Sequence, residues 1–170
     1  MGATLSARRR IAAVFCGGFC GTILRALLST GIQSYLGKGW PYDILLINIT
    51  GAFFLAVFTT LADATVLIGP TRRLFINVGF LGAYTTFSSL ALGDILLFSG
   101  GKTLLAFLYL LCSLVGGILA VMLGDWVGQQ VVKLVRRSYP KTALGPAEVL
   151  LADRLKESDS IDIQDDLVPK

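Results

Sequence analysis

The chain has 170 residues, of which 54% are hydrophobic and 15% are charged, and its formal net charge is +4. Soluble domains usually carry about 25% charged residues, so this composition excludes an ordinary soluble domain and indicates an integral membrane protein. The sequence has no histidine, and its three cysteines lie in apolar runs, where we interpret them as small hydrophobic residues and not as disulfide or zinc ligands.

The first apolar run predicts a membrane-spanning helix over about residues 11–30, since about 20 apolar residues cross a bilayer. The run has no convincing cleavage site, which favours a retained span over a signal peptide. Gly17 and Gly21 form a small-xxx-small pair that is typical of close helix packing. Arg25 lies near the end of the span, where it either reaches the membrane surface or acts as a buried cation at a pore mouth.

A turn-rich link over residues 31–42 leads to the second predicted span, residues 43–61. Asn48 is the one strongly polar side chain of this span away from its ends, and a buried amide needs hydrogen-bond partners. Asn48 therefore faces other helices or water. An interhelical hydrogen bond is slightly favoured over a role in an ion path.

A polar link over residues 63–73 precedes the third predicted span, residues 74–98. Its middle, residues 79–89, contains glycine, threonine and serine, and both glycine and β-branched threonine weaken a helix. One interpretation is a broken helix that presents carbonyls and hydroxyls to a polar partner. The other is tight helix packing, with the hydroxyls bonded to their own helix.

A short turn over residues 99–102 separates this span from the fourth, residues 103–123. Tyr109, Ser113 and Gly117 are four residues apart and share one face of that helix. They form either a polar track or an ordinary packing face in which Ser113 bonds its own backbone. Residues 125–137 predict an amphipathic continuation at the membrane surface.

The chain divides by charge into a transmembrane domain, residues 1–138, and a polar tail, residues 139–170. The first part holds eleven basic and four acidic residues, whereas the tail holds four basic and seven acidic ones. Residues 146–156 predict a short helix, and the rest of the tail has the composition of a disordered segment.

The distribution of lysine and arginine predicts that both termini are cytoplasmic in the plasma membrane. With four spans, the termini and the second link share one side of the bilayer, which carries nine basic residues against two on the other side. The nine are Arg8, Arg9, Arg10, Arg72, Arg73, Lys133, Arg136, Arg137 and Lys141, and the two are Lys38 and Lys102.

Three motifs occur in a fixed order along the spans. They are Gly17-Gly18-Phe19-Cys20-Gly21 with Arg25, then Ile47-Asn48-Ile49-Thr50-Gly51-Ala52-Phe53, then residues 79–89, Gly-Phe-Leu-Gly-Ala-Tyr-Thr-Thr-Phe-Ser-Ser. Together they resemble the Fluc/CrcB family of fluoride channels, and the third motif is the most specific. The resemblance covers about residues 11–125.

This resemblance implies an all-α antiparallel dimer of four-helix subunits, with two fluoride pores and a sodium ion buried at the dimer centre. The backbone carbonyls of Gly82 and Thr85 are the implied sodium ligands, at a break in the third helix. The implied pore residues are Asn48, Phe87, Thr86, Tyr109, Ser113 and Arg25.

The chain departs from the family pattern at three positions. Leu90 stands where a second phenylalanine is expected, Gly93 where a glutamate is expected, and Gly117 where a hydroxyl is expected. These differences and the basic-residue bias favour an oppositely inserted paralogue as partner over a second copy of this chain.

Passive fluoride export is the leading interpretation of function. A proton-coupled multidrug exporter is the alternative, but it needs a carboxylate within the membrane, and the acidic residues of the spans lie near their ends. A non-conducting subunit of a heterodimeric channel is a third possibility. No nucleophile, base and metal constellation is visible, so no enzyme activity is expected, and neither is a nucleic-acid partner.

Overall fold

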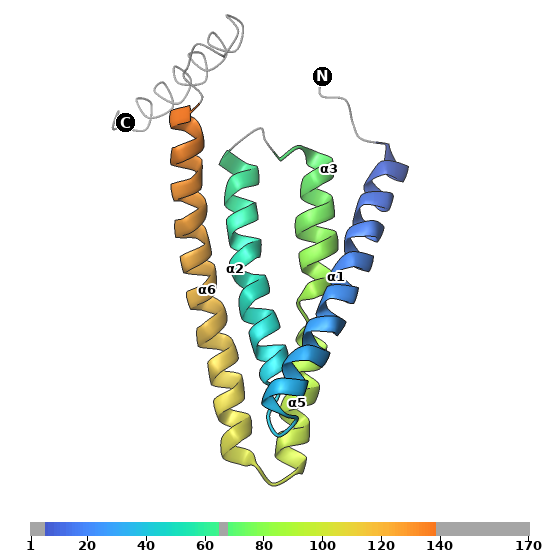
Figure 1. The fold of residues 1–170 in the computed structure, drawn as a ribbon, viewed down its shortest axis with the longest axis vertical. Coiled ribbons are helices and arrows are strands. Elements are labelled where there is room, and N and C mark those ends of the chain that lie inside the picture. The colour runs from blue at the N-terminus through green and yellow to red at the C-terminus, as the bar shows by residue number, and fades with distance from the viewer. Residues whose placement is uncertain (1–5, 65–67, 139–170) are drawn as a thin grey trace, which may run out of the picture. The chain divides into compact units, whose positions relative to one another are not determined.

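The structure is a computed structural model that describes residues 6–64 and 68–138, with side chains described as far as Val135. These residues form helices joined by short turns and contain no β-strand. Four helical stretches are long and apolar enough to cross a membrane: Ala7–Leu36, Tyr42–Ala64, Pro70–Ser99 and Thr103–Val135 (Figure 1). The four predicted spans are therefore confirmed, and the chain is a multi-pass membrane protein.

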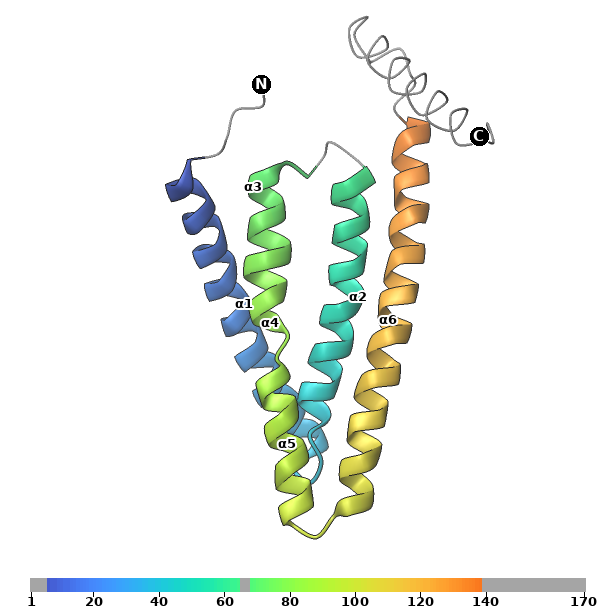
Figure 2. The ribbon, with the colours of Figure 1, turned by 180° about the vertical axis from the view of Figure 1, so that it is seen from behind.

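Three of the spans are single helices, and the third is composite. The single helices are α1 (Ala7–Leu36), α2 (Tyr42–Ala64) and α6 (Thr103–Ser138). The third span consists of α3 (Pro70–Arg73), the π-helical segment η1 (Leu74–Leu81), α4 (Gly82–Tyr84) and α5 (Phe87–Ser99) (Figure 2). Backbone contacts divide the chain after Val132, so the last residues of α6 belong to a second unit.

Two predicted boundaries differ most from the ends of the helices. The first span continues through Leu36, because Gly31 is accommodated within the helix and Gly37, with a φ of 78°, ends it instead. The fourth helix continues without interruption past residue 123, where the sequence predicted a separate amphipathic piece. The tail, residues 139–170, and its predicted short helix lie outside the described residues.

Glycines bring α1 against the backbone of η1. A Cβ atom at Gly17 would collide with the carbonyl oxygen of Phe75, and one at Gly21 would collide with that of Phe80. Across the same contact, a Cβ atom at Gly79 would lie 2.7 Å from the carbonyl oxygen of Val14. The prediction that Gly17 and Gly21 mediate close helix packing is confirmed.

A second glycine face joins α6 to α2. A Cβ atom at Gly116 would lie 2.7 Å from Ile49, and one at Gly128 would lie 2.8 Å from Thr60. A Cβ atom at Gly124, between them, would collide with the backbone carbonyl oxygen of Phe53. The sequence pointed instead to Gly117, whose Cβ would meet no atom within 4 Å. In both views of the ribbon, α2 lies between α6 and the first part of the third span, α3 and η1 (Figures 1 and 2), whereas Leu97 of α5 packs directly against Ala106 and Tyr109 of α6.

Candidate functional site

The backbone of the third span leaves the helical conformation at Thr85 and Thr86, between α4 and α5. Thr85 has φ −79° and ψ 153°, and Thr86 has φ −152° and ψ 117°, which are both extended. A helix that is interrupted within an apolar span leaves backbone groups that must find other partners. The candidate site is built around those groups.

The side-chain amide of Asn48, in α2, makes hydrogen bonds to both the carbonyl oxygen and the N–H group of Thr86. Asn48 Nδ2 donates to the Thr86 carbonyl oxygen at 3.0 Å, and the Thr86 N–H donates to Asn48 Oδ1 at 2.8 Å. The expected interhelical hydrogen bond of Asn48 is thus confirmed, and its partner is the extended backbone itself. The site therefore begins with one α2 side chain that holds the extended backbone between α4 and α5.

The next residues of α2 contact the same segment. The hydroxyls of Thr50 and Tyr84 lie 3.0 Å apart and share a hydrogen bond. A Cβ atom at Gly51 would collide with the side chain of Thr85, so only glycine lets α2 approach this closely. No role for Thr50 or Tyr84 was predicted from the sequence, although both lie inside the motifs, and their place in the motifs was the available signal.

Two carbonyl groups lose their usual donors at this point. In a continuous helix, the N–H four residues ahead would pair with each carbonyl. For Gly82 that donor is Thr86, which donates to Asn48 instead. For Thr85 it is Ser89, whose N–H donates to Thr86 Oγ1 at 3.3 Å. Carbonyl oxygens without donors are the ligand type that hard cations take, so the donor set of Gly82 and Thr85 fits such an ion.

The first turn of α5 gathers hydroxyl groups beside an exposed aromatic ring. Thr86 Oγ1 lies 3.2 Å from Ser88 Oγ, and it donates to Ser89 Oγ at 3.2 Å. Phe87, the first residue of α5, is 81% exposed in the single subunit. The predicted residues Asn48, Thr86 and Phe87 are therefore close together at one place.

The predicted residues of α6 and α1 lie apart from this group. Tyr109 is fully buried against Trp40, and its hydroxyl has no hydrogen-bond partner among the described residues. Ser113 Oγ donates to the Tyr109 carbonyl oxygen at 2.7 Å, so its proton is committed to its own helix. Arg25 is half-buried, and no hydrogen bond or ion pair joins it to another residue in the described part of the chain. Among the described residues, no hydrogen bond joins these three to Asn48.

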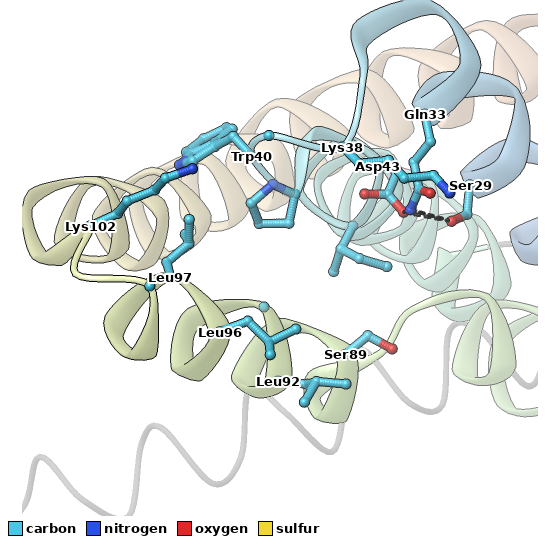
Figure 3. A pocket seen from close by; sticks show the side chains of 15 residues that line it. Ser29, Gln33, Lys38, Trp40, Asp43, Ser89, Leu92, Leu96, Leu97 and Lys102 are labelled. Carbon is cyan, nitrogen blue, oxygen red and sulfur yellow. Dashed lines mark hydrogen bonds between the residues drawn. The ribbon is translucent and has the colours of Figure 1, made fainter.

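A cavity of about 470 Å³ extends from two lysines to the first turn of α5 (Figure 3). Lys38 and Lys102 line it, and so does Ser89, whose hydroxyl receives the Thr86 bond. Figure 3 also shows Asp43 in its wall, where this residue is only 3% exposed. We call this space the Asp43 cavity.

Two side chains of α1 hold the Asp43 carboxylate in that wall. Ser29 Oγ donates to Asp43 Oδ2 at 2.5 Å, and Gln33 Nε2 donates to the same oxygen at 2.8 Å. Ser29 lies at the end of the predicted first span, whereas Gln33 lies in the predicted link, so the second of these bonds could not be foreseen from the predicted spans.

Comparison with known proteins gives a consistent picture. Residues 12–125 match the family model described as CrcB-like protein, Camphor Resistance (CrcB). The chain is 40% identical to a protein of Acidobacterium capsulatum over 70% of its own length and 95% of the relative's, and 39% identical to one of Thermus thermophilus over 70% and 93%. Both relatives are named fluoride-specific ion channel FluC. A Desulfitobacterium hafniense relative, 38% identical over 66% and 97%, is named fluoride-specific ion channel FluC 1.

Proposed function

The chain belongs to the CrcB-like family and is a fluoride channel, and we propose that fluoride crosses the membrane past the extended backbone that Asn48 holds. The observation that carries this proposal is the double hydrogen bond between the Asn48 amide and Thr86. It fixes the amide group in an otherwise apolar span. A channel needs such small polar groups to replace the hydration of the ion.

Asn48 retains a donor for the anion. Its Nδ2 carries two hydrogens, and the hydrogen bond to the Thr86 carbonyl uses one of them. The second is available to fluoride. The edge of the Phe87 ring is electropositive and can meet an anion without a full charge, and the exposure of that ring in the subunit supports this role.

Tyr109 and Ser113 of α6 form the second part of the proposed path. The Tyr109 hydroxyl is buried without a hydrogen-bond partner in the described part of the chain, which is unfavourable unless an acceptor such as an anion or water reaches it. Ser113 donates to its own helix, so its hydroxyl must rotate before it can donate to an anion. Arg25 adds a positive charge near the end of the predicted first span.

The Asp43 cavity is the proposed mouth of this path. Lys38 and Lys102 outnumber the one carboxylate of the lining, Asp43, so the net charge of the cavity favours the arrival of anions from the aqueous side. Ser89 joins the cavity to Thr86, the residue that Asn48 binds. The cavity thus ends at Ser89, one hydrogen bond away from the proposed pore residue Thr86.

We propose further that the carbonyl oxygens of Gly82 and Thr85 bind a sodium ion at the centre of an antiparallel dimer. Their lost amide donors support this, and so does the exposure of Gly82 on the subunit surface. A bound sodium ion would supply a fixed positive charge that holds carbonyl groups of the two subunits together.

The proposed partner in that dimer is an oppositely inserted paralogue. Leu90 has no phenyl ring, and its side chain packs against the cluster of Leu97, Ala106 and Tyr109. A Cβ atom at Gly93 would lie 3.3 Å from Pro41, which leaves little room for a glutamate. Numbered names occur among the relatives, FluC 1 in Desulfitobacterium hafniense and FluC 2 in Clostridium acetobutylicum, and such numbering supports a second copy of the gene in an organism.

Ion release from liposomes tests the function and the sodium proposal together. The chain should release fluoride and retain chloride, alone or with a co-encoded paralogue. Replacing sodium by a large organic cation should weaken release, because the carbonyls of Gly82 and Thr85 would then lack their ligand. Equal release of fluoride and chloride would contradict the fluoride pathway. Full fluoride release without sodium would contradict the ion at the dimer centre alone.

A further inference from the structure

Five arginines gather where α1 begins and the third span begins. Arg8, Arg9 and Arg10 stand in the first turn of α1, and Arg72 and Arg73 end α3. All five are exposed. Arg73 pairs with Asp63 at 2.7 Å, and neither first turn contains an acidic residue.

The placement of three arginines in the first turn of α1 is electrostatically unfavourable by itself. The first N–H groups of a helix carry partial positive charge, and acidic side chains usually offset it. Here the N-cap residue, Ser6, makes no side-chain capping bond. The start of α1 therefore combines exposed N–H groups with guanidinium groups, a combination that an external anion would stabilise.

Below the arginines, two apolar grooves flank the contact between α1 and η1. One has a volume of about 520 Å³ and is lined by Arg9 and Arg72 together with apolar residues that include Ala12, Cys16 and Phe75. The other, about 540 Å³, is lined by Arg10 with Ile11, Val14, Phe15 and Leu74. Each groove combines a basic group at the start of a span with an apolar floor along it.

We propose that the groove between Arg9 and Arg72 binds an anionic phospholipid of the leaflet where the N-terminus emerges. The phosphate lies against the two guanidinium groups, and an acyl chain lies along Ala12, Cys16 and Phe75. Charge complementarity selects the headgroup, since basic groups between membrane helices attract anionic lipids. The groove at Arg10 repeats the arrangement on the other side of the same contact.

Native mass spectrometry of the purified channel tests this proposal with phosphatidylglycerol and phosphatidylcholine of identical acyl chains. Phosphatidylglycerol should be retained at least tenfold better. Each arginine near an anionic headgroup contributes roughly fivefold to affinity, so Arg9→Gln/Arg72→Gln should remove the preference. Arg9→Lys/Arg72→Lys keeps both positive charges and should retain most of the preference for phosphatidylglycerol. This variant therefore distinguishes a loss of lipid binding from a loss of folding.

Two matched controls locate the site. Lys38→Gln/Lys102→Gln removes the same charge from the other predicted side of the membrane and should leave the preference unchanged. Cys16→Trp fills the groove without changing charge and should lower retention of both lipids. Cys112→Trp, at another exposed cysteine, should not.

Four results would overturn the proposal. They are equal retention of the two lipids by the unmodified channel, an equal loss of preference in the lysine control, an equal effect of the two tryptophan variants, and displacement of phosphatidylglycerol by soluble glycerol phosphate at similar concentration. The last would indicate an anion site in which the groove has no part. A second copy of the chain seated in the groove would give the first result.

Discussion

Asn48 uses both ends of its side-chain amide on the backbone of a single residue, Thr86. The sequence identified the amide and its need for partners, because a lone polar side chain in an apolar span must be satisfied. It could not identify Thr86 as the partner, since that contact depends on how closely α2 approaches the third span. That approach is set by Gly51, whose neighbours Tyr84 and Thr85 are distant in sequence.

A substitution at Phe87 should change fluoride conduction without changing the stability of the subunit. Because its ring is 81% exposed in the subunit, Phe87→Ile should change the subunit's stability by no more than about 0.5 kcal/mol. It should nevertheless abolish fluoride efflux, since isoleucine offers no electropositive ring edge. Phe98→Ile, at a half-exposed position on the same helix, should leave efflux intact. Normal efflux from the Phe87 variant would remove this residue from the path.

At the scale of elements, the extended segment and α2 depend on each other. Gly51→Ala places a methyl group against Thr85 and Tyr84, so we expect a loss of about 1–3 kcal/mol in stability together with weaker fluoride efflux. Gly117→Ala is the matched control, because no atom lies within 4 Å of its Cβ position. Chemical unfolding in detergent measures the stability of both variants, and release from liposomes measures their fluoride efflux. An unchanged Gly51→Ala variant would mean that α2 does not constrain the extended backbone.

The four spans could be predicted because apolar length alone identifies them, and the packing role of Gly17 and Gly21 follows from their spacing. The π-helical turns of η1 could not, since nearly every residue of that segment is apolar and no periodicity distinguishes one helix type from another. The face of α6 was also missed. Gly116 and Gly117 are adjacent, and only the position of α2 decides which of them is in contact.

At the scale of the whole molecule, orientation decides what this chain can pair with. Nine basic residues against two should fix both termini in the cytoplasm, whereas an antiparallel homodimer needs one sequence that inserts both ways. Tags at both termini, tested for accessibility in intact cells, should therefore all be protected. If about half of the C-termini were exposed when the chain is expressed alone, a homodimer would be possible and the paralogue unnecessary.

The central claim is that fluoride passes the extended backbone held by Asn48, and efflux from liposomes tests it most directly. Asn48→Ala should abolish fluoride release, since it removes the free amide donor and both hydrogen bonds to Thr86. Asn77→Ala is the matched control, because Asn77 is another part-buried amide, bonded to Thr59 and not to the candidate path. Release at the normal rate from a folded Asn48→Ala channel, or an equal loss in the Asn77 variant, would contradict the account.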